Sequence, residues 1–328
     1  MQSIIPLFFN RLSSSKLLSV TILLISSMLP STFVSANTRT FAHAKNMQFY
    51  MSQIVNPSTP RNYRNITELN RVAAWIKEQM RLFDIHCEYQ HFVVNSLGYK
   101  NIICHVPAQG SSKQKLERII LAAHYDVKGQ NQGLNNNASG VVGLIEAARL
   151  LKSDQKKLNT PVDIVFHSLE EAPFFKTEYM GSLEHAKALK KQKLKVKGVF
   201  LLDSIGNFKP DMQQSYPYAL MWLYPNQPDF VASVANMKAF SLSQHYCEQI
   251  QLKLGCERFF GALFFQKYEY SAYENYNKYH YPTVLITDTA YYRNSNYDRE
   301  RERMDDLDFN KMENIVNALV KTVVHIGQ

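Results

Sequence analysis

Short, continuous apolar runs limit what this chain of 328 residues can fold into. They lie within residues 118–123, 162–166, 196–202 and 282–286, where Arg118, Asp163 and Lys197 are the charged exceptions. Runs of this length without polar alternation are typical of strands that are buried on both faces of a sheet. Segments with apolar residues at helical spacing lie between them, which is typical of parallel strands joined by helical crossovers. We therefore predict an α/β fold, a three-layer sandwich with a mixed, mostly parallel central sheet flanked by helices.

Other predicted elements surround these strands. Thr67 is a candidate cap for a helix that continues to about residue 80, and residues 85–94 and 99–106 alternate like two antiparallel strands. Helices are predicted over 138–152, 178–189, 240–254 and 309–326, and a further strand over 219–224. The sequence shows no internal repeat and no second core, so we predict one domain over residues 37–328.

Residues 1–36 have the features of a secretory signal peptide. Arg11 and Lys16 precede an apolar run over 17–29, and Val34-Ser35-Ala36 offers small residues at the cleavage spacing. A run of 13 residues is too short to cross a bilayer comfortably, although an uncleaved anchor is the rival interpretation. We expect an exported protein, periplasmic or secreted, with no stable membrane span once the leader is cleaved.

The charge of the chain is basic, with a formal value of +9. Removal of the leader, which holds two basic and no acidic residues, leaves +7. The densest basic run, residues 187–197, reads as the exposed end of a helix and the loop after it. No nucleic-acid-binding motif accompanies it, so we predict a solvated surface and no nucleic-acid partner.

The four cysteines permit disulfides in an exported chain. Cys87 and Cys104 fall on consecutive predicted strands, where they can face each other. Cys247 and Cys256 lie on or near one helix, and a separation of nine residues does not favour their pairing, so ordinary buried thiols are the alternative and the pairing stays open. No Cys-x-x-Cys spacing is present, which argues against a zinc site built from thiolates.

Polar side chains follow each of the continuous apolar strands. They are His124 and Asp126, the pair Glu170 and Glu171, Asp203, and Asp288. The carboxyl ends of parallel strands meet at one edge of a sheet, where ligands bind in folds of this kind. The polar loop 133–140 opens the helix after the first of these strands, so we expect it at the same edge.

These residue types suit metal-assisted hydrolysis. His-x-Asp after a strand offers a metal ligand together with a carboxylate that fixes its ring. Two adjacent carboxylates are costly to bury unless something positive lies beside them. One carboxylate of Glu170–Glu171 can then bind a metal, while the other accepts a proton from a metal-bound water.

Five motifs carry a resemblance to a known family. They are His-Tyr-Asp at 124–126, Gly-Leu-Asn-Asn-Asn-Ala-Ser-Gly at 133–140, Glu-Glu-Ala-Pro-Phe-Phe-Lys-Thr-Glu-Tyr-Met-Gly-Ser at 170–182, Leu-Leu-Asp-Ser-Ile-Gly at 201–206, and Thr-Asp-Thr-Ala-Tyr-Tyr-Arg-Asn at 287–294. In order and spacing, from about residue 62 onward, they resemble the zinc aminopeptidase family of bacterial leucyl aminopeptidase and aminopeptidase Y. The resemblance implies the α/β fold predicted above and a site for two zinc ions.

The resemblance also implies a role for each residue. His124 and Asp203 would bind the first metal, and Asp126 would orient His124. Glu170 would be the general base, and Glu171 would bind the second metal.

Two metal-binding positions depart from the family pattern. Asn136 stands where the family has an aspartate that bridges the metals, and Asp298 stands where it has its last histidine. An amide has one carbonyl oxygen and no charge, so Asn136 alone weakens a two-metal site. The carboxylate of Asp298 compensates for this lost negative charge. The ligands of the family carry three negative charges, and Glu171, Asp203 and Asp298 also carry three. The donor set is richer in oxygen than zinc prefers, so one or two zinc ions, manganese, or another oxygen-preferring divalent ion are the candidate cofactors.

Three interpretations follow for the function. The first is an exported aminopeptidase that removes N-terminal residues from peptides with a metal-activated water. The second is a catalytically inactive pseudopeptidase that binds peptides or a protein partner, and the third is a residual pocket.

Glutaminyl cyclases share the fold, but two of their three zinc ligands are changed here. Ser139 lacks the Gly-x-Ser-x-Gly context of a serine hydrolase.

Overall fold

The computed structural model describes residues 41–109, 117–209, 213–216, 222–261, 271–289, 292–293 and 302–328. Residues Thr40–Gln328 form one compact unit. The predicted leader lies outside the described residues, so both the leader and the single domain over 37–328 stay predictions. Within the described part of the chain, no helix is long and apolar enough to cross a bilayer.

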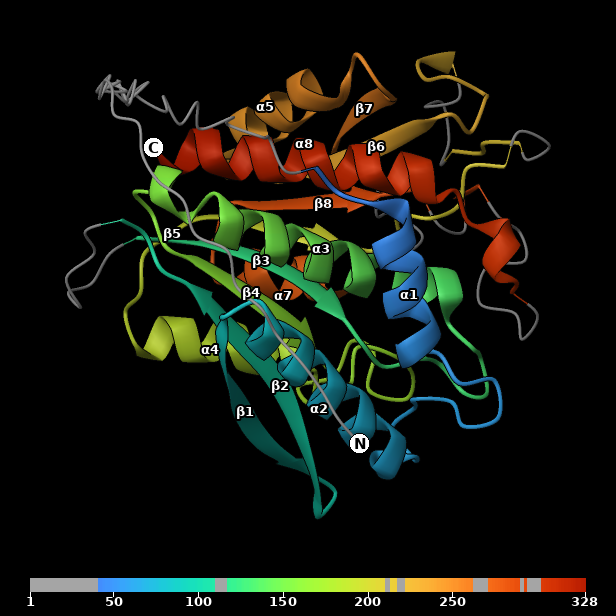
Figure 1. Ribbon diagram of the computed structural model, residues 1–328, viewed down its shortest axis with the longest axis vertical. Coiled ribbons are helices and arrows are strands. Elements are labelled where there is room, and N and C mark those ends of the chain that lie inside the picture. Colours follow the sequence, from blue (N-terminus) through green and yellow to red (C-terminus); the bar gives the residue numbers. More distant parts are fainter. Residues whose placement is uncertain are drawn as a thin grey trace, which may run out of the picture. The chain divides into compact units, whose positions relative to one another are not determined.

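An eight-stranded sheet runs through the described residues (Figure 1). Its strand order is β1-β2-β4-β3-β5-β8-β6-β7. The four inner strands β4, β3, β5 and β8 are mutually parallel, whereas the pairs β1–β2, β2–β4 and β6–β8 are antiparallel. The strands are β1 His86–Val94, β2 Leu97–Val106, β3 Arg118–His124, β4 Val162–His167, β5 Val196–Leu202, β6 Phe230–Ala235, β7 Gly255–Phe260 and β8 Thr283–Thr287. The predicted mixed, mostly parallel sheet is confirmed.

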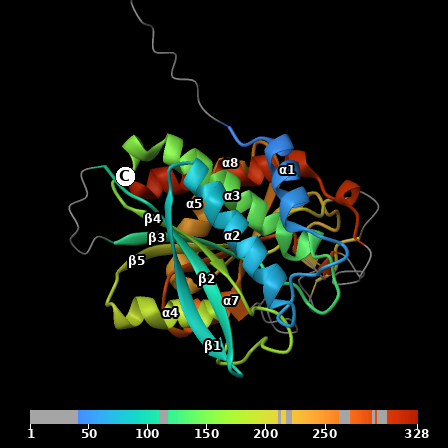
Figure 2. The same ribbon diagram turned by 60° about the horizontal axis from the view of Figure 1, so that its bottom comes forward.

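Helices cover both faces of this sheet, which makes three layers. Figure 2 shows α1, α2, α3 and α8 on one side and α4 and α7 on the other. The helices are α1 Ala44–Ile54, α2 Ile66–Leu82, α3 Gly140–Ser153, α4 Gly181–Lys191, α5 Phe240–Ile250, α7 Ser271–Lys278 and α8 Phe309–Gly327. Helix α5 packs against α8 and joins the first layer.

Strand β3 shows why the apolar runs are continuous. Ile119 and Leu121 are buried in the core that includes α3 and α8, while Ile120 and Ala122 are buried in the core that includes α4 and α7. Successive side chains on a strand point to opposite faces, so a sheet covered on both faces favours apolar residues at successive positions. Each fully buried isoleucine or leucine contributes about 1.5–3 kcal/mol of stability.

Several element boundaries differ from the sequence-based expectation. The cap of α2 is Asn65, whose side chain accepts a hydrogen bond from the N–H of Glu68, and Thr67 lies inside the helix. A π-helical segment, Leu134–Ser139, precedes α3, which begins at Gly140. Helix α4 begins at Gly181, after a loop that the pattern had placed in the helix.

Among the α-helices and β-strands of the described residues, four were not predicted, namely α1, β6, β7 and α7. The strand predicted over 219–224 lies partly outside the described residues, and its described part, residues 222–224, is not a strand. The true strand β6 begins at Phe230. Its pairing with both β7 and β8 is a long-range contact that local alternation does not reveal.

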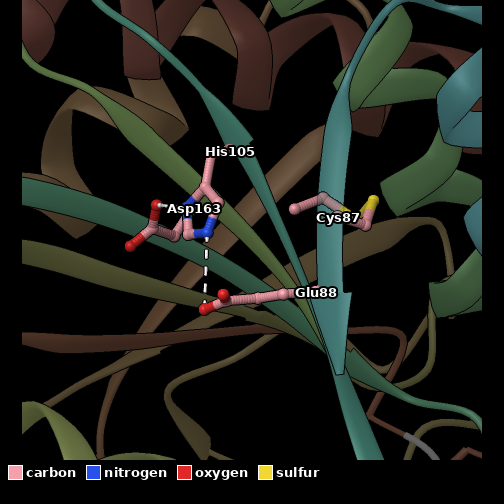
Figure 3. The surroundings of a disulfide bond; sticks show 5 residues. Cys87, Glu88, His105 and Asp163 are labelled. Carbon is pink, nitrogen blue, oxygen red and sulfur yellow. Dashed lines mark hydrogen bonds and ion pairs between the residues drawn. A yellow bond between two sulfur atoms is a disulfide. The ribbon is translucent and has the colours of Figure 1, made fainter. Parts of the chain in front are cut away.

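Two disulfides form in the structure. Cys87 and Cys104 pair across neighbouring positions of β1 and β2, as the strand prediction allows (Figure 3). Cys247 and Cys256 also form a disulfide, so the inference that their separation of nine residues does not favour pairing is wrong. The chain turns back after Ile250, and this reversal returns Cys256 to the last turns of α5 with a Cα–Cα distance of 5.3 Å.

A buried polar cluster lies between the sheet and helices α4 and α7. The hydroxyl of Tyr276 is 3.0 Å from Nε2 of His167 and 2.6 Å from Nδ1 of His185. Burial lowers the pKa of His167 well below its usual value and that of His185 to about 4, so both rings are neutral at neutral pH. A neutral imidazole has one N–H, so Tyr276 can donate to one ring and accept from the other.

The disulfides give a first prediction. Denatured, unreduced protein should expose no reactive thiol, and reduction should release four. Replacing Cys87→Ser together with Cys104→Ser should lower the free energy of unfolding by about 3 kcal/mol, because the bridge closes a loop with a sequence separation of 17 residues. Thiol titration and denaturant unfolding measure the two effects. A reactive thiol in unreduced protein would contradict the pairing.

The buried cluster predicts acid sensitivity. The unfolded chain protonates His185 near pH 6.5 and the folded chain only near pH 4, so its stabilising contribution is present above about pH 6.5. That contribution, about 3 kcal/mol, is lost as the pH falls towards 4. His185→Gln removes the titration, so the stability of the wild type should fall more steeply than that of the variant between about pH 7 and about pH 4.5. Urea unfolding tests this, and an equal acid dependence of the two proteins would refute it.

Candidate functional site

The four inner parallel strands end at the same edge of the sheet. His124 is the last residue of β3 and Asp126 follows it, while Glu170 and Glu171 follow β4 and Asp203 follows β5. The sequence-based expectation that these side chains converge agrees with the contacts below. The structure does not test the individual roles implied by the family resemblance, which remain predictions.

The ring of His124 is held between two carboxylates. Its Nδ1 is 3.2 Å from the backbone oxygen of Asp126 and 3.4 Å from Oδ1 of the same residue, and its Nε2 is 3.7 Å from Oδ1 of Asp203. Burial alone would lower the pKa of His124, but the charges of Asp203 and Asp126 raise it well above its usual value. The surroundings of this ring therefore favour a positive charge.

Asp126 joins two strand ends. Its Oδ1 accepts a hydrogen bond from the N–H of Glu170 at 3.2 Å, and its Oδ2 accepts one from the N–H of Glu171 at 3.1 Å. The sequence predicted only that Asp126 orients His124. The structure adds that the same carboxylate holds the backbone of the glutamate pair.

Glu170 is 4% exposed and is held through both carboxylate oxygens. Oε1 accepts a hydrogen bond from the N–H of Ser182 at 2.7 Å, and Oε2 accepts one from the Ser182 hydroxyl at 2.8 Å. Burial raises the pKa of Glu170 to about 8, although the bonds from Ser182 and the charge of His124 act in the opposite direction. A carboxyl group with a pKa near neutrality can both accept and return a proton.

Asn136 and Glu171 lie together. Nδ2 of Asn136 donates a hydrogen bond to Oε1 of Glu171 at 2.8 Å. Asn136 belongs to the buried π-helical segment Leu134–Ser139, and its φ and ψ of −103° and 94° are not helical. The contact brings the loop after β3 to the loop after β4.

Arg61 supports the loop that leads from β3 to the π-helical segment. Its buried guanidinium donates to the backbone oxygens of Tyr125, Gln132 and Gly133 at 2.8, 2.7 and 2.6 Å. Burial lowers the pKa of Arg61 to about 10, and the charge of Asp126 partly opposes this shift. Sequence reasoning missed Arg61, because an isolated arginine in a polar segment has no local signature.

Gly133 is required at its place in this loop. Its φ is +60°, and a Cβ atom there would lie 2.2 Å from Cγ1 of Val127 and 2.5 Å from the backbone oxygen of Asn136. A side chain at this position would therefore force the π-helical segment to move.

Asp288 joins the end of β8 to the same segment. Its Oδ2 accepts hydrogen bonds from Nδ2 of Asn135 at 2.9 Å, from the N–H of Gly206 at 3.1 Å, and from the N–H of Asn207 at 2.8 Å. This buried carboxylate thus braces two loops of the site. The sequence predicted that Asp288 lies at this edge of the sheet but did not indicate which groups it binds.

Glu302 braces the start of the π-helical segment. Its Oε2 accepts hydrogen bonds from the N–H groups of Leu134 and Asn135 at 2.7 and 3.2 Å. Asp298, the remaining predicted metal ligand, lies outside the described residues.

The donor set fits a divalent cation in part. The facing His124 and Asp203 side chains offer one nitrogen and one carboxylate, and Asn136 and Glu171 offer oxygens nearby. Among the described residues, no three His, Cys, Asp or Glu side chains are gathered closely enough to hold an ion as they stand.

Known proteins resemble this chain in sequence and in fold. A model of peptidase family M28 matches residues 101–323. The uncharacterized protein YfbL of Escherichia coli (strain K12) is 33% identical over 288 residues, which cover 83% of this chain and 84% of that protein.

Solved structures share the fold at low identity. The Legionella pneumophila LapA aminopeptidase has a TM-score of 0.68 at 16% identity, with coverage of 87% of this chain and 72% of that one. An aminopeptidase from Aneurinibacillus sp. strain AM-1 has a TM-score of 0.66 at 13% identity, covering 86% and 93%. A glutaminyl cyclase of Porphyromonas gingivalis has a TM-score of 0.64 at 17% identity, covering 86% and 98%. At these identities the structures support the fold alone, but the family model spans more than half of the chain, which therefore belongs to peptidase family M28.

Proposed function

We propose that this protein is a metal-dependent peptidase of the aminopeptidase type. The observation that carries the proposal is Glu170, a buried carboxylate whose pKa is raised to about 8, next to the His124–Asp203 pair. A proton acceptor beside a cation site is the arrangement that metal-assisted hydrolysis needs. Membership of peptidase family M28 supports a peptide substrate, and two aminopeptidases are among the solved structures that share the fold.

His124 and Asp203 would hold the first ion, and Glu171 with Asn136 and Asp298 would complete the donor set. Zinc is the expected metal, and manganese is the alternative because the set is rich in oxygen. When bound, the ion supplies polarisation of the scissile carbonyl and a lower pKa for water. Asp126 keeps the His124 ring in the orientation that directs Nε2 towards Asp203.

The reaction proposed is hydrolysis of a peptide bond near a free N-terminus. Water adds to the carbonyl carbon, and Glu170 takes one proton from that water. The C–N bond then breaks as Glu170 passes the proton to the leaving amine. The products are a free amino acid and a shortened peptide, so atoms and charge balance.

We also propose that the mature protein begins after Ala36 and acts in the periplasm or outside the cell. The predicted leader supports export, and the two disulfides are typical of an oxidising compartment. No lasting membrane span is proposed after cleavage of the leader.

A second candidate function rests on the hydrogen bond between Asn136 and Glu171. An amide N–H directed at Glu171 occupies one oxygen of a proposed metal ligand. In a catalytically inactive member of the fold, this bond would replace the second ion, and the site would bind peptides without cleaving them. Peptide binding without turnover under any metal would favour this candidate.

The general-base role predicts the effect of Glu170→Gln. Loss of the proton acceptor should lower kcat by about 100- to 10,000-fold on aminoacyl anilides, while the bound metal stays unchanged. Glu178→Gln is a matched control, because Glu178 is an exposed carboxylate of the same loop and should leave kcat unchanged. The assay uses zinc, manganese and cobalt in turn. No turnover with any metal, or an unchanged rate in Glu170→Gln, would refute the proposal.

The two altered ligand positions predict a compensating pair. Asn136→Asp adds a carboxylate and Asp298→His removes one, so the double variant keeps the charge of the donor set while restoring a nitrogen ligand. We expect the double variant to bind more zinc per chain, and to turn over faster, than either single variant. Elemental analysis and initial rates measure this. If one single change restores as much as both, charge balance does not explain the pair.

A further inference from the structure

We propose that Ser182, held by Asn275, is a positioning residue that fixes the Glu170 carboxylate in its working orientation. This inference rests on the proposed function, because it assigns the support of the proposed general base. Ser182 lies at the start of α4 and Asn275 lies on α7, the two helices that cover the same face of the sheet.

Ser182 holds both oxygens of one carboxylate. Its N–H reaches Oε1 of Glu170 at 2.7 Å, and its hydroxyl reaches Oε2 at 2.8 Å. Two bonds from one rigid residue set the plane of the carboxylate as well as its position, which a single bond cannot do. A buried general base works faster when its orientation is fixed in this way, because small errors in its orientation lower the rate of the reaction.

Asn275 determines the direction of the second bond. Its Nδ2 donates to Oγ of Ser182 at 2.7 Å. A hydroxyl can rotate and either donate or accept. Once Oγ accepts from Asn275, the hydroxyl hydrogen is left to point at Glu170.

A purely structural role explains the Ser182 side chain less well. The cap of α4 is Met180, which makes no side-chain capping bond, and the hydroxyl of Ser182 bonds no backbone group of its helix. Alanine is the best helix former, so Ser182→Ala should leave α4 intact. The hydroxyl has its two partners, Glu170 and Asn275, outside the helix.

Asn277 provides a matched control on α7. Its Oδ1 accepts a hydrogen bond from Nδ2 of Asn236 at 3.1 Å. Asn277→Ala therefore removes a side-chain hydrogen bond from the same helix without touching Ser182 or Glu170.

The kinetic experiment uses the full mature protein loaded with metal. Ser182→Ala should lower kcat by about 10- to 100-fold, because a bond to a charged group is lost, while KM and bound metal stay unchanged. Ser182→Thr, which keeps the hydroxyl, should recover most of the rate. Asn275→Ala should lower kcat in the same direction by less, and Asn277→Ala should match the wild type.

A wild-type kcat in Ser182→Ala would overturn the proposal. A loss confined to KM or metal content would also overturn it, as would equal losses in Asn275→Ala and Asn277→Ala. If Ser182→Ala does not fold, the comparison of Asn275→Ala with Asn277→Ala decides the question, because Asn275 is only partly buried.

An infrared measurement separates this proposal from the proposed function. The difference spectrum between wild type and Glu170→Gln identifies the infrared band of the Glu170 carboxyl group. That band should shift in Ser182→Ala and stay in place in Asn277→Ala. If the wild type hydrolyses nothing with any metal, the peptidase proposal fails, while the band shift still tests the positioning. An unmoved band refutes it.

Discussion

The carboxylate of Asp126 is the group on which the rest of the site depends. It lies against the ring of His124 at the end of β3 and accepts the N–H groups of Glu170 and Glu171 after β4. One buried charge thereby sets the distance between the proposed ligand and the proposed base. Such a charge is tolerated inside a protein only with strong partners, and Arg61 supplies the nearby positive charge.

The site is supported from both layers of helices. Arg61, just ahead of α2, holds the loop after β3 from one layer. Ser182 on α4 and Asn275 on α7 hold Glu170 from the other. Catalytic side chains on loops are accurate only when rigid elements fix them, and here the sheet edge and both helical layers share that task.

Much of the fold could be read from local pattern. The runs that became β3, β4, β5 and β8 are apolar on both faces, and their polar residues mark the strand ends. Elements whose evidence is non-local were missed. Strand β6 is recognisable only by its pairing with β7 and β8. The buried face of α1 is recognisable only by its packing against α3 and α8. The Cys247–Cys256 pairing depends on the chain reversal after α5, which spacing along the sequence does not show.

The sequence by itself determined the α/β class, the edge of the sheet that carries the site, and the identity of the residues gathered there. These follow from short-range rules, because the burial of a strand and the polarity of its end are visible within a few residues. Only the tertiary structure decided how those residues are held. The bonds from Arg61 to Tyr125, from Asn275 to Ser182, and from Asn136 to Glu171 join segments separated by 64, 93 and 35 residues. Such contacts exist only after the helices have packed on the sheet, so no local pattern encodes them.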